Sequence, residues 1–384
     1  MNKFFKILFS IFFVLLFEIS FSYSEETKIK IGVLAPLSGE DANLGKQILN
    51  SIRMALIDIK NNNIEIYPKD TRSDPDVTLR SALELEKMGI SLVIGPVFHK
   101  NLLFLDKVKN ITFLSLTNKT LDLHKNIISS GINSSSQLNT IKKFLEKSEI
   151  KKTIFLIPNL SYDLEIKKGI KESKIKFFKQ YNYDIDPTKL TKQIEKITNY
   201  GIRKQNLLDE ISRVDKSDDP NKEKIIENLE KKYTLGKVKF DSVIIADFDE
   251  SLKSVVTSLL YTDVSPKNKF IITLNQWFDE SLLKEKNLQP IYYPSINKQN
   301  LDDFTNKFFK KFNYKPNYLS LLSYDLVGLI YYLSLKNETL EISKSFKTQN
   351  TFKGKIGVFE VKDNKINHQL NFYEINNGKL TEIF

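Results

Sequence analysis

The side chains able to do covalent or metal chemistry are few and scattered in this chain. It has no cysteine, and its three histidines, His99, His124 and His368, are not spaced as metal ligands on one helix. No Gly-x-Ser-x-Gly segment carries an activated serine. Asp70 and Asp247 each follow a predicted strand and could face one another as the carboxylate pair of a glycosidase, but carboxylates that only cap a strand end are commoner. We therefore expect a binding protein, without enzymatic activity, cofactor or metal.

The candidate ligand site consists of polar and aromatic residues that follow predicted strands in two successive α/β units. The carboxyl ends of the strands in such units line one crevice, and ligand pockets there combine aromatic walls with a few polar groups. We expect the first unit to contribute Ser38, Asp70, Phe98, His99, Ser115, Thr117 and Asn118, and the second to contribute Asn159, Tyr162, Asp247, Gln276 and Trp277.

Several of these residues also have a purely structural interpretation. Ser115, Thr117 and Asn118 could bind a ligand or cap free backbone N–H groups. Trp277, the one tryptophan of the chain, could stack on a ligand or close the core of the second unit. His99 could titrate near neutral pH or be an exposed loop residue. The sequence leaves these alternatives open.

Alternating strands and helices position the first half of the candidate site. Asp74 followed by Pro75 marks a helix start, because aspartate caps free N–H groups and proline fits the first turn. The periodicity of apolar residues predicts strands at residues 28–35, 64–67, 90–94 and 111–114, with helices at about 44–60, 75–87 and 101–109. This alternation is typical of a parallel sheet covered by helices on both faces.

The same alternation begins again after residue 137. Strands are predicted at residues 152–157, 176–181, 241–246 and 269–274, with helices at about 137–147, 162–173 and 187–197. The charged segment at residues 201–237 interrupts this unit and is expected to form a helical hairpin on the surface, either a docking element or decoration. Helices at about 301–312 and 320–335 and β structure at 357–361 and 370–375 follow.

A chain of 384 residues is long for one hydrophobic core, so two domains are expected. The predicted fold class is α/β, with two doubly wound lobes and a central cleft. Lobe 1 is expected to contain residues 25–127 and about 292–340. Lobe 2 is expected to contain residues 128–291 and about 341–384, including the hairpin.

The N-terminus resembles a secretory signal peptide. Lys3 and Lys6 precede an apolar run at residues 7–17, and the small residues Ser22 and Ser24 follow. We expect cleavage after Ser24 and a periplasmic location, the alternative being an uncleaved anchor. The run is shorter than the roughly 20 residues of a membrane-spanning helix, and no later span is expected.

The net charge of +11 does not indicate a nucleic-acid-binding protein. Its lysines are interspersed with glutamate and aspartate along predicted helices and form no concentrated basic stripe. Nucleic acid is therefore not an expected partner, although the charge could favour an anionic surface such as phospholipid headgroups.

Several segments resemble the leucine/isoleucine/valine-binding branch of the type I periplasmic binding proteins. They are residues 31–39 (IGVLAPLSG), Gly45 with Ala55, residues 93–96 (VIGP), residues 240–247, and Ser323-Tyr324-Asp325. The resemblance extends over nearly the whole chain after the leader, and it implies two lobes with a ligand cleft between them.

Within that superfamily, three strand-end segments resemble the penicillin-binding-protein activators. They are residues 68–71 (PKDT), 95–98 (GPVF) and 115–118 (SLTN). This resemblance implies a regulator whose partner is a peptidoglycan synthase, a penicillin-binding protein.

The alternative is the substrate-binding subunit of an ABC importer for amino acids or a related small polar solute, with the importer permease as partner. Family members that bind amino acids have a hydroxyl residue shortly after the Gly-Pro of the third strand, and here that position is His99. Ser115 and Thr117 match the second half of that pattern, but Tyr162 is followed by Asp163 in place of glycine. The regulator is therefore the interpretation that we prefer.

Overall fold

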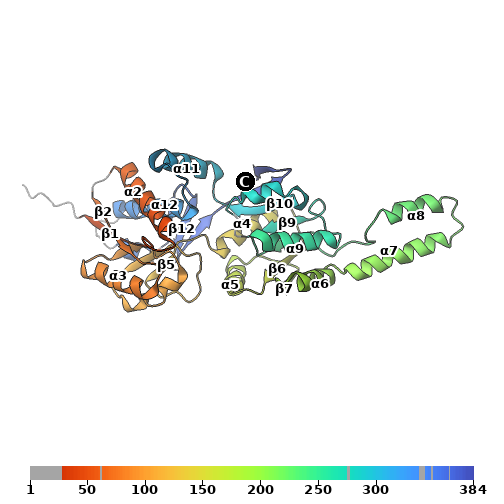
Figure 1. Ribbon diagram of the computed structural model, residues 1–384, viewed down its shortest axis with the longest axis horizontal. Coiled ribbons are helices and arrows are strands. Elements are labelled where there is room, and N and C mark those ends of the chain that lie inside the picture. Colours follow the sequence, from red (N-terminus) through yellow and green to blue (C-terminus); the bar gives the residue numbers. More distant parts are fainter. Residues whose placement is uncertain (1–27, 61–62, 275–276, 337–341, 347–348, 363) are drawn as a thin grey trace, which may run out of the picture.

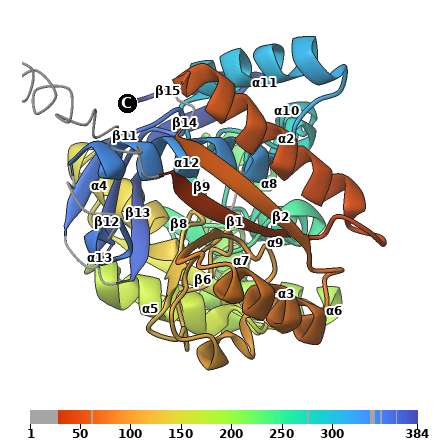
Figure 2. The ribbon, with the colours of Figure 1, turned by 90° about the vertical axis from the view of Figure 1, so that its left-hand side faces the viewer.

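The computed structural model describes residues 28–60, 63–274, 277–336, 342–346, 349–362 and 364–384. The expected signal peptide and Gln276 lie outside these residues. Two α/β lobes lie side by side, and a pair of helices projects from the far end of the second (Figure 1). Figure 2 shows the first lobe from its outer end, with its sheet between helices.

Lobe 1 is built on an eight-stranded sheet in the order β11-β12-β13-β5-β4-β3-β1-β2. The first five strands along the chain pair in parallel, and the hairpin of β12 and β13 adds to β5 at one edge. The strands are β1 (Ile29–Ala35), β2 (Ile64–Asp70), β3 (Leu92–Ile94), β4 (Thr112–Ser115), β5 (Ile127–Ser129), β11 (Asn350–Lys353), β12 (Val358–Lys362) and β13 (Lys365–Gln369).

Among the described residues, lobe 1 has four longer helices, whose apolar side chains are buried in its core, and one short helix. They are α2 (Ala42–Ile59), α3 (Pro75–Lys87), α11 (Lys298–Phe312), α12 (Tyr318–Lys336) and the short α13 (Ile342–Ser345). The side chain of Asp74 accepts a hydrogen bond from the Val77 N–H at 2.8 Å, so the predicted cap of α3 is present. A Cβ on Gly45 of α2 would lie 1.9 Å from the Pro36 carbonyl oxygen, which explains why glycine is needed where α2 approaches the loop after β1.

Within the described residues, α12 is the helix with the length and apolar composition of a membrane span, which differs from our expectation. Of its most apolar stretch, 56% is buried, and Leu322, Leu326 and Leu329 lie in the core. It packs along α2, so its apolar composition is that of a core helix.

Lobe 2 is built on a seven-stranded sheet in the order β15-β14-β10-β9-β8-β6-β7. Its strands are β6 (Thr153–Pro158), β7 (Lys179–Tyr183), β8 (Ser242–Ile245), β9 (Phe270–Thr273), β10 (Ile291–Ser295), β14 (Asn371–Asn376) and β15 (Lys379–Glu382). Its helices are α4 (Ser134–Lys147), α5 (Asp163–Ser173), α6 (Pro187–Ile197), α9 (Asp249–Tyr261) and α10 (Glu280–Lys284). The prediction of two α/β lobes is confirmed.

The described chain passes between the lobes at three places: from β5 to α4, from β10 to α11, and from β13 to β14. His368 of β13 links two of these crossings. Its Nε2 lies 2.9 Å from the Ser130 carbonyl oxygen, and its backbone N–H donates to Ser136 Oγ at 2.9 Å.

The expected division of the chain differs from the observed sheets at both C-terminal segments. Strands β11, β12 and β13 belong to the sheet of lobe 1, although residues 341–384 were expected in lobe 2, and β10 belongs to lobe 2, although residues from 292 were expected in lobe 1. β5 likewise belongs to lobe 1. Alternating apolar residues indicate a strand, but they do not specify which sheet edge the strand joins.

The predicted helix at residues 101–109 is wrong. Two short 3₁₀ turns, His99–Leu102 and Leu105–Lys107, occupy this segment. Leu102, Leu105 and Val108 are all buried, and their spacing of three residues fits the three residues per turn of a 3₁₀ helix.

The charged segment after α6 contains α7 (Tyr200–Asp215) and α8 (Lys222–Glu230), and this helix pair projects away from lobe 2 (Figure 1). A small apolar cluster that includes Leu207, Val214 and Leu229 joins the two helices. The buried Arg203 fixes the base of the pair, because its guanidinium donates to the Thr198 carbonyl oxygen at 3.0 Å and to Thr234 Oγ1 at 2.9 Å.

Candidate functional site

Asp70, at the end of β2, ties together the loops on the cleft side of lobe 1. Its Oδ1 accepts hydrogen bonds from the backbone N–H groups of Leu37 at 2.8 Å and Arg72 at 2.9 Å, and its Oδ2 accepts from Ser38 Oγ. Partial burial opposes ionisation, but these hydrogen bonds, that of Ser38 first, hold the pKa of Asp70 below its usual range. Asp70 and Ser38 are therefore brought together, and each satisfies the other.

The hydroxyl groups after β4 are also used within lobe 1. Ser115 is fully buried and donates to the Pro96 carbonyl oxygen at 2.9 Å. Thr117 Oγ1 accepts from the Lys119 N–H at 3.2 Å, while Asn118 is exposed at the rim. Ser115 and Thr117 thus have the partners of loop-stabilising residues, which is the structural alternative that the sequence left open.

Asp247 follows β8 and is 2% exposed. Its carboxylate accepts hydrogen bonds from Tyr183 at 2.6 Å, Tyr162 at 3.3 Å and Ser251. Burial and the adjacent Asp247 carboxylate raise the pKa of Tyr162, which keeps this phenol neutral and able to donate. Asp70 and Asp247 thus each accept hydrogen bonds from groups of their own lobe.

A cavity of about 280 Å³ remains between the lobes beside this cluster. Three of the expected site residues line it, namely Asn118, Tyr162 and Trp277. The other lining residues are Lys119, Ile132, Ser134, Gln137, Glu165, Ile166 and Phe248. Trp277 of lobe 2 stacks on Tyr318 of lobe 1, with ring centroids 4.9 Å apart and planes at 24°, so at least one face of the indole is already occupied.

A direct contact between the lobes closes one side of this cavity. Glu165 of α5 accepts hydrogen bonds from the Thr120 N–H at 2.9 Å, from Thr120 Oγ1 at 3.0 Å and from the Leu121 N–H at 2.8 Å. These two residues belong to the loop between β4 and β5 of lobe 1. Lys168, one turn further along α5, donates to the Thr120 carbonyl oxygen at 2.6 Å.

The same face of α5 makes a third contact with lobe 1. Glu172 pairs with Lys365 of β13, with Oε2 and Nζ 2.6 Å apart and with 28% and 14% of the two side chains exposed. Residues 165, 168 and 172 share one side of the helix because a helix turns once in 3.6 residues. We call Glu165, Lys168 and Glu172, together with Thr120 and Lys365, the interlobe latch.

His99 lies half-buried near this latch. Burial, and then the positive charge of Lys119, lower the pKa of His99, while the carboxylates of Glu165 and Asp122 oppose this shift. The imidazole is therefore neutral near pH 7. It occupies the position where a ligand-binding hydroxyl was expected from the resemblance.

The remaining expected site residues do not join the cavity. Phe98 packs against the core of lobe 1, and Asn159 is exposed after β6, where its N–H donates to the Tyr183 carbonyl oxygen at 2.8 Å. Gln276 lies outside the described residues. The sequence reasoning missed Glu165, Lys119 and Phe248, because single charged or aromatic residues carry no signal that distinguishes a cleft from the solvent.

Residues 28–202 match the model of a family described as periplasmic binding protein. Solved structures of such proteins superpose on almost the whole chain. A leucine-binding protein, LivK from Thermotoga maritima, has a TM-score of 0.55 and 12% identity over 93% of this chain and 98% of its own length. This chain has the type I periplasmic-binding-protein fold.

Two further proteins are similar to this chain. The C-domain of LpoA from Haemophilus influenzae, described as a regulator of PBP1A, has a TM-score of 0.62 and 13% identity, covering 92% of this chain and 100% of that domain. An uncharacterised protein of Rickettsia prowazekii is 24% identical in an alignment of length 258 that covers 63% of this chain and 68% of that protein. At these identities the structural likeness establishes the fold alone.

Proposed function

We propose that this chain is an exported, non-enzymatic regulator of peptidoglycan synthesis that acts by docking on a penicillin-binding protein. The observation that carries the proposal is the interlobe latch, in which Glu165 and Lys168 of lobe 2 bind both polar backbone groups of Thr120 in lobe 1. The likeness to the LpoA C-domain, a regulator of PBP1A, supports the same function.

The latch matters because of how a transport protein of this fold works. A small ligand can favour the closed state only through contacts that it makes better there than in the open state. Here the chain supplies contacts between the lobes itself, and Ser115 and Asp247 of the cleft walls already have partners within their own lobes. A fixed arrangement of lobes suits a platform on which another protein docks.

The projecting helix pair gives such a platform a rigid extension. Arg203 holds its base through hydrogen bonds to two different segments. Ile202 and Leu208 of α7 expose 64% and 52% of their surface, and Tyr233, just after α8, exposes 77%. Exposed apolar side chains on a firmly held helix are typical of contact surfaces between proteins. We infer that this helix pair contributes to docking.

The alternative function is that of a substrate-binding subunit of an ABC importer. The cavity of about 280 Å³ favours it, because aromatic residues (Tyr162, Phe248, Trp277) and a cation (Lys119) line the space between the lobes. This volume is close to the lower end of the ~300–1,000 Å³ range of ligand pockets. A small anionic or polar solute would fit that chemistry.

Two measurements on the mature chain, residues 25–384, separate these functions. The first is the rate of glycan-strand synthesis by a bifunctional penicillin-binding protein of the same organism, with and without the chain. The second is thermal unfolding in the presence of each common amino acid, where a ligand at 1,000 times its Kd would add about 4 kcal/mol of stability. We expect stimulated synthesis and no stabilisation by amino acids. Stabilisation by an amino acid without any effect on synthesis contradicts the regulator and supports the importer subunit.

A further inference from the structure

The parallel sheet of lobe 1 brings together lysines that lie far apart in the sequence. Strands β1 to β5 pair in parallel and end on the cleft side, so all five begin at the opposite, outer end of the lobe. Figure 2 looks onto this end. An exposed lysine comes shortly before each of the five strands. We call these residues the outer-face lysines: Lys28, Lys60, Lys87, Lys109 and Lys125.

The segments that lead into these strands contain no acidic residue, and this distinguishes them from the segments at the other end of the sheet. The leading segments are residues 60–63, 87–91, 109–111 and 124–126. The segments at the ends of β1 and β2, residues 36–41 and 70–76, contain Glu40, Asp41, Asp70, Asp74 and Asp76 beside one arginine. Lobe 1 therefore has a basic outer end and acidic loops toward the cleft, and such a polarity orients a protein in the field of a charged surface.

The nearby carboxylates of the outer end have partners within the protein. Glu65 of β2 pairs with Lys28 at 2.5 Å, and Glu86 of α3 accepts a hydrogen bond from the Asn110 N–H at 2.9 Å. Among the described residues, Lys109 and Lys125 have no ion pair, and Lys109 Nζ donates to the backbone carbonyl oxygen of Asp106 at 2.7 Å. The ammonium groups of these two lysines are therefore not neutralised by a carboxylate.

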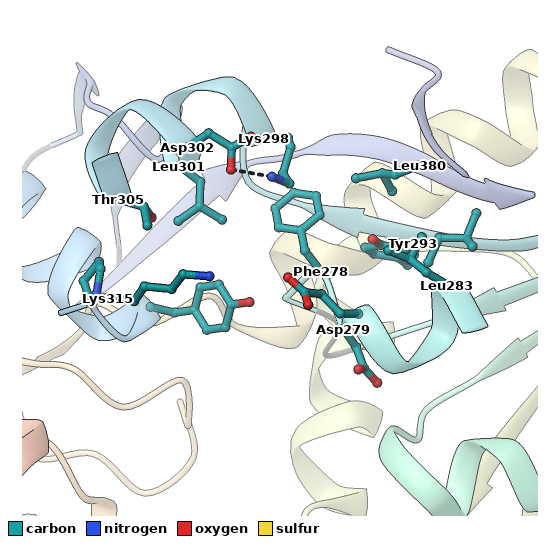
Figure 3. A pocket seen from close by; sticks show the side chains of 14 residues that line it. Phe278, Asp279, Leu283, Tyr293, Lys298, Leu301, Asp302, Thr305, Lys315 and Leu380 are labelled. Atoms are coloured by element: carbon teal, nitrogen blue, oxygen red, sulfur yellow. Dashed lines mark hydrogen bonds and ion pairs between the residues drawn. The ribbon is translucent and has the colours of Figure 1, made fainter. Parts of the chain in front are cut away.

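The cavity around Phe278 shows a contrasting use of a lysine (Figure 3). There Lys298 forms an ion pair with Asp302, and its Nζ lies 5.7 Å from the centre of the Phe278 ring. The charge of Lys298 is balanced within the protein. The charges of Lys109 and Lys125 act instead on whatever lies in front of the outer end.

Lys109 and Lys125 line an open hollow of about 560 Å³ at the starts of β4 and β5. His124 and Lys344 of α13 add further basic groups, and Asp106 is the one acidic residue among the described residues that line the hollow. Lysine ammonium groups bind phosphate oxygens through charge-assisted hydrogen bonds. The hollow therefore has the charge that a phosphate group requires.

Apolar side chains are exposed among the outer-face lysines. Met88, in the turn between α3 and β3, follows Lys87 and is 43% exposed. Ile57, in the last turn of α2, precedes Lys60 by three residues and is 57% exposed. Surfaces that bind membranes combine basic side chains with apolar ones that enter the boundary between headgroups and acyl chains. A soluble polyanion has no apolar layer to receive such side chains.

We propose that the outer end of lobe 1 binds the surface of a membrane that contains anionic phospholipids. The outer-face lysines contact lipid phosphates, Lys109 and Lys125 hold one headgroup in the hollow, and Met88 enters the apolar boundary. β1 begins at this end directly after the expected leader, so a leader inserted in a membrane would hold the same end toward it. The projecting helix pair lies at the other end of the molecule and then points away from the membrane (Figure 1). This surface does not depend on the proposed action on a synthase.

Co-sedimentation of the mature chain with lipid vesicles tests the proposal. We expect binding to phosphatidylcholine vesicles that contain 30 mol% phosphatidylglycerol, and binding at least tenfold weaker to pure phosphatidylcholine. Because salt screens charges, 0.5 M NaCl should abolish it. Lys109→Glu combined with Lys125→Glu should weaken binding at least tenfold, since two positive charges at the bilayer are reversed. The corresponding double change to glutamine should weaken it less.

Lys192→Glu combined with Lys204→Glu is the matched control. It makes the same change of net charge at exposed positions of α6 and α7 in lobe 2, and it should leave vesicle binding within twofold of the wild type. Both double variants should unfold at the wild-type temperature, because all four lysines are exposed and have no ion pair among the described residues. If both weaken vesicle binding equally, net charge and not the outer end determines binding, and the proposal is overturned.

Met88→Ser distinguishes a membrane from a soluble polyanion. It should weaken binding to the phosphatidylglycerol vesicles about threefold and leave binding to inorganic polyphosphate unchanged. Polyphosphate binding as tight as vesicle binding, with no effect of Met88→Ser on either, overturns the proposal, because the surface would then be a site for polyanions in general. Absence of sedimentation with phosphatidylglycerol vesicles at low salt also overturns it.

Discussion

Replacing Glu165 by glutamine removes the charge of the carboxylate that joins the two lobes, with almost no change of shape. The wild-type carboxylate accepts hydrogen bonds from three donors of lobe 1, namely the N–H and hydroxyl of Thr120 and the N–H of Leu121. The glutamine amide oxygen can still accept from both N–H groups, and its NH₂ can donate to the Thr120 hydroxyl, so the substitution removes the charge from these hydrogen bonds and reverses one of them. A hydrogen bond to a charged group contributes about 1.5–3 kcal/mol. Since the site is half-buried, we expect Glu165→Gln to lower the free energy of unfolding by about 2 kcal/mol.

Urea unfolding followed by circular dichroism measures this loss. Asp163→Asn is the matched control, because Asp163 lies on the same helix and its ion pair among the described residues is with Lys167 of that helix, at 2.7 Å. Pairs four residues apart on one helix contribute about 0.3–0.5 kcal/mol, so the control should unfold almost like the wild type. If Glu165→Gln is as stable as Asp163→Asn, the latch does not hold the lobes together and the reasoning is refuted.

Three other residues give predictions of the same kind. Burial lowers the pKa of His368 to about 4, below its unfolded value of about 6.5, so this residue's contribution of roughly 3 kcal/mol is complete above pH 6.5 and is lost as the pH falls toward 4. Urea unfolding of the wild type and of His368→Phe at each pH should differ in slope over that window, and equal slopes contradict the prediction. Arg203→Leu leaves the Thr198 carbonyl oxygen without its donor, so it should lower the free energy of unfolding by about 2 kcal/mol. It should also speed proteolysis between α6 and α7, which gel electrophoresis of timed digests detects. Asp70→Asn keeps an oxygen for Leu37 and Arg72 but loses the acceptor for Ser38. We expect it to lower the free energy of unfolding by about 1 kcal/mol at pH 7, and by less below pH 4, where the wild-type carboxyl also becomes protonated. A difference that does not change with pH would argue against this role of Asp70.

The order of strands and helices could be predicted because local patterns specify it. The start of α3 at Asp74-Pro75 and the apolar spacing along α2 each depend on residues within a few turns of each other. The sheet that β11, β12 and β13 join depends on pairing with β5, more than 200 residues away along the chain. Such pairing leaves no local pattern, and the expected lobe boundary was therefore misplaced.

The candidate site, too, could be predicted only in part. Topology alone brings Asn118, Tyr162 and Trp277 to one cavity, as expected from their places after strands. The residues next to Ser115 and Glu165 in the sequence do not reveal that Ser115 donates to a carbonyl oxygen, or that Glu165 binds the opposite lobe. A glutamate on the exposed side of a helix has the same appearance in a sequence whether it binds water or a partner 45 residues away.

The distance between the lobes in the ligand-free protein is the most direct test of the latched platform on which the proposed function depends. The chain has no cysteine, so Asp76→Cys in lobe 1 and Lys192→Cys in lobe 2, both at exposed positions, accept spin labels without further changes. Pulsed electron-spin measurements should give one narrow distance distribution, which common amino acids leave unchanged and Glu165→Gln broadens. A broad or two-peaked distribution that an amino acid converts to one short distance would contradict the latched platform and identify a ligand-gated binding protein.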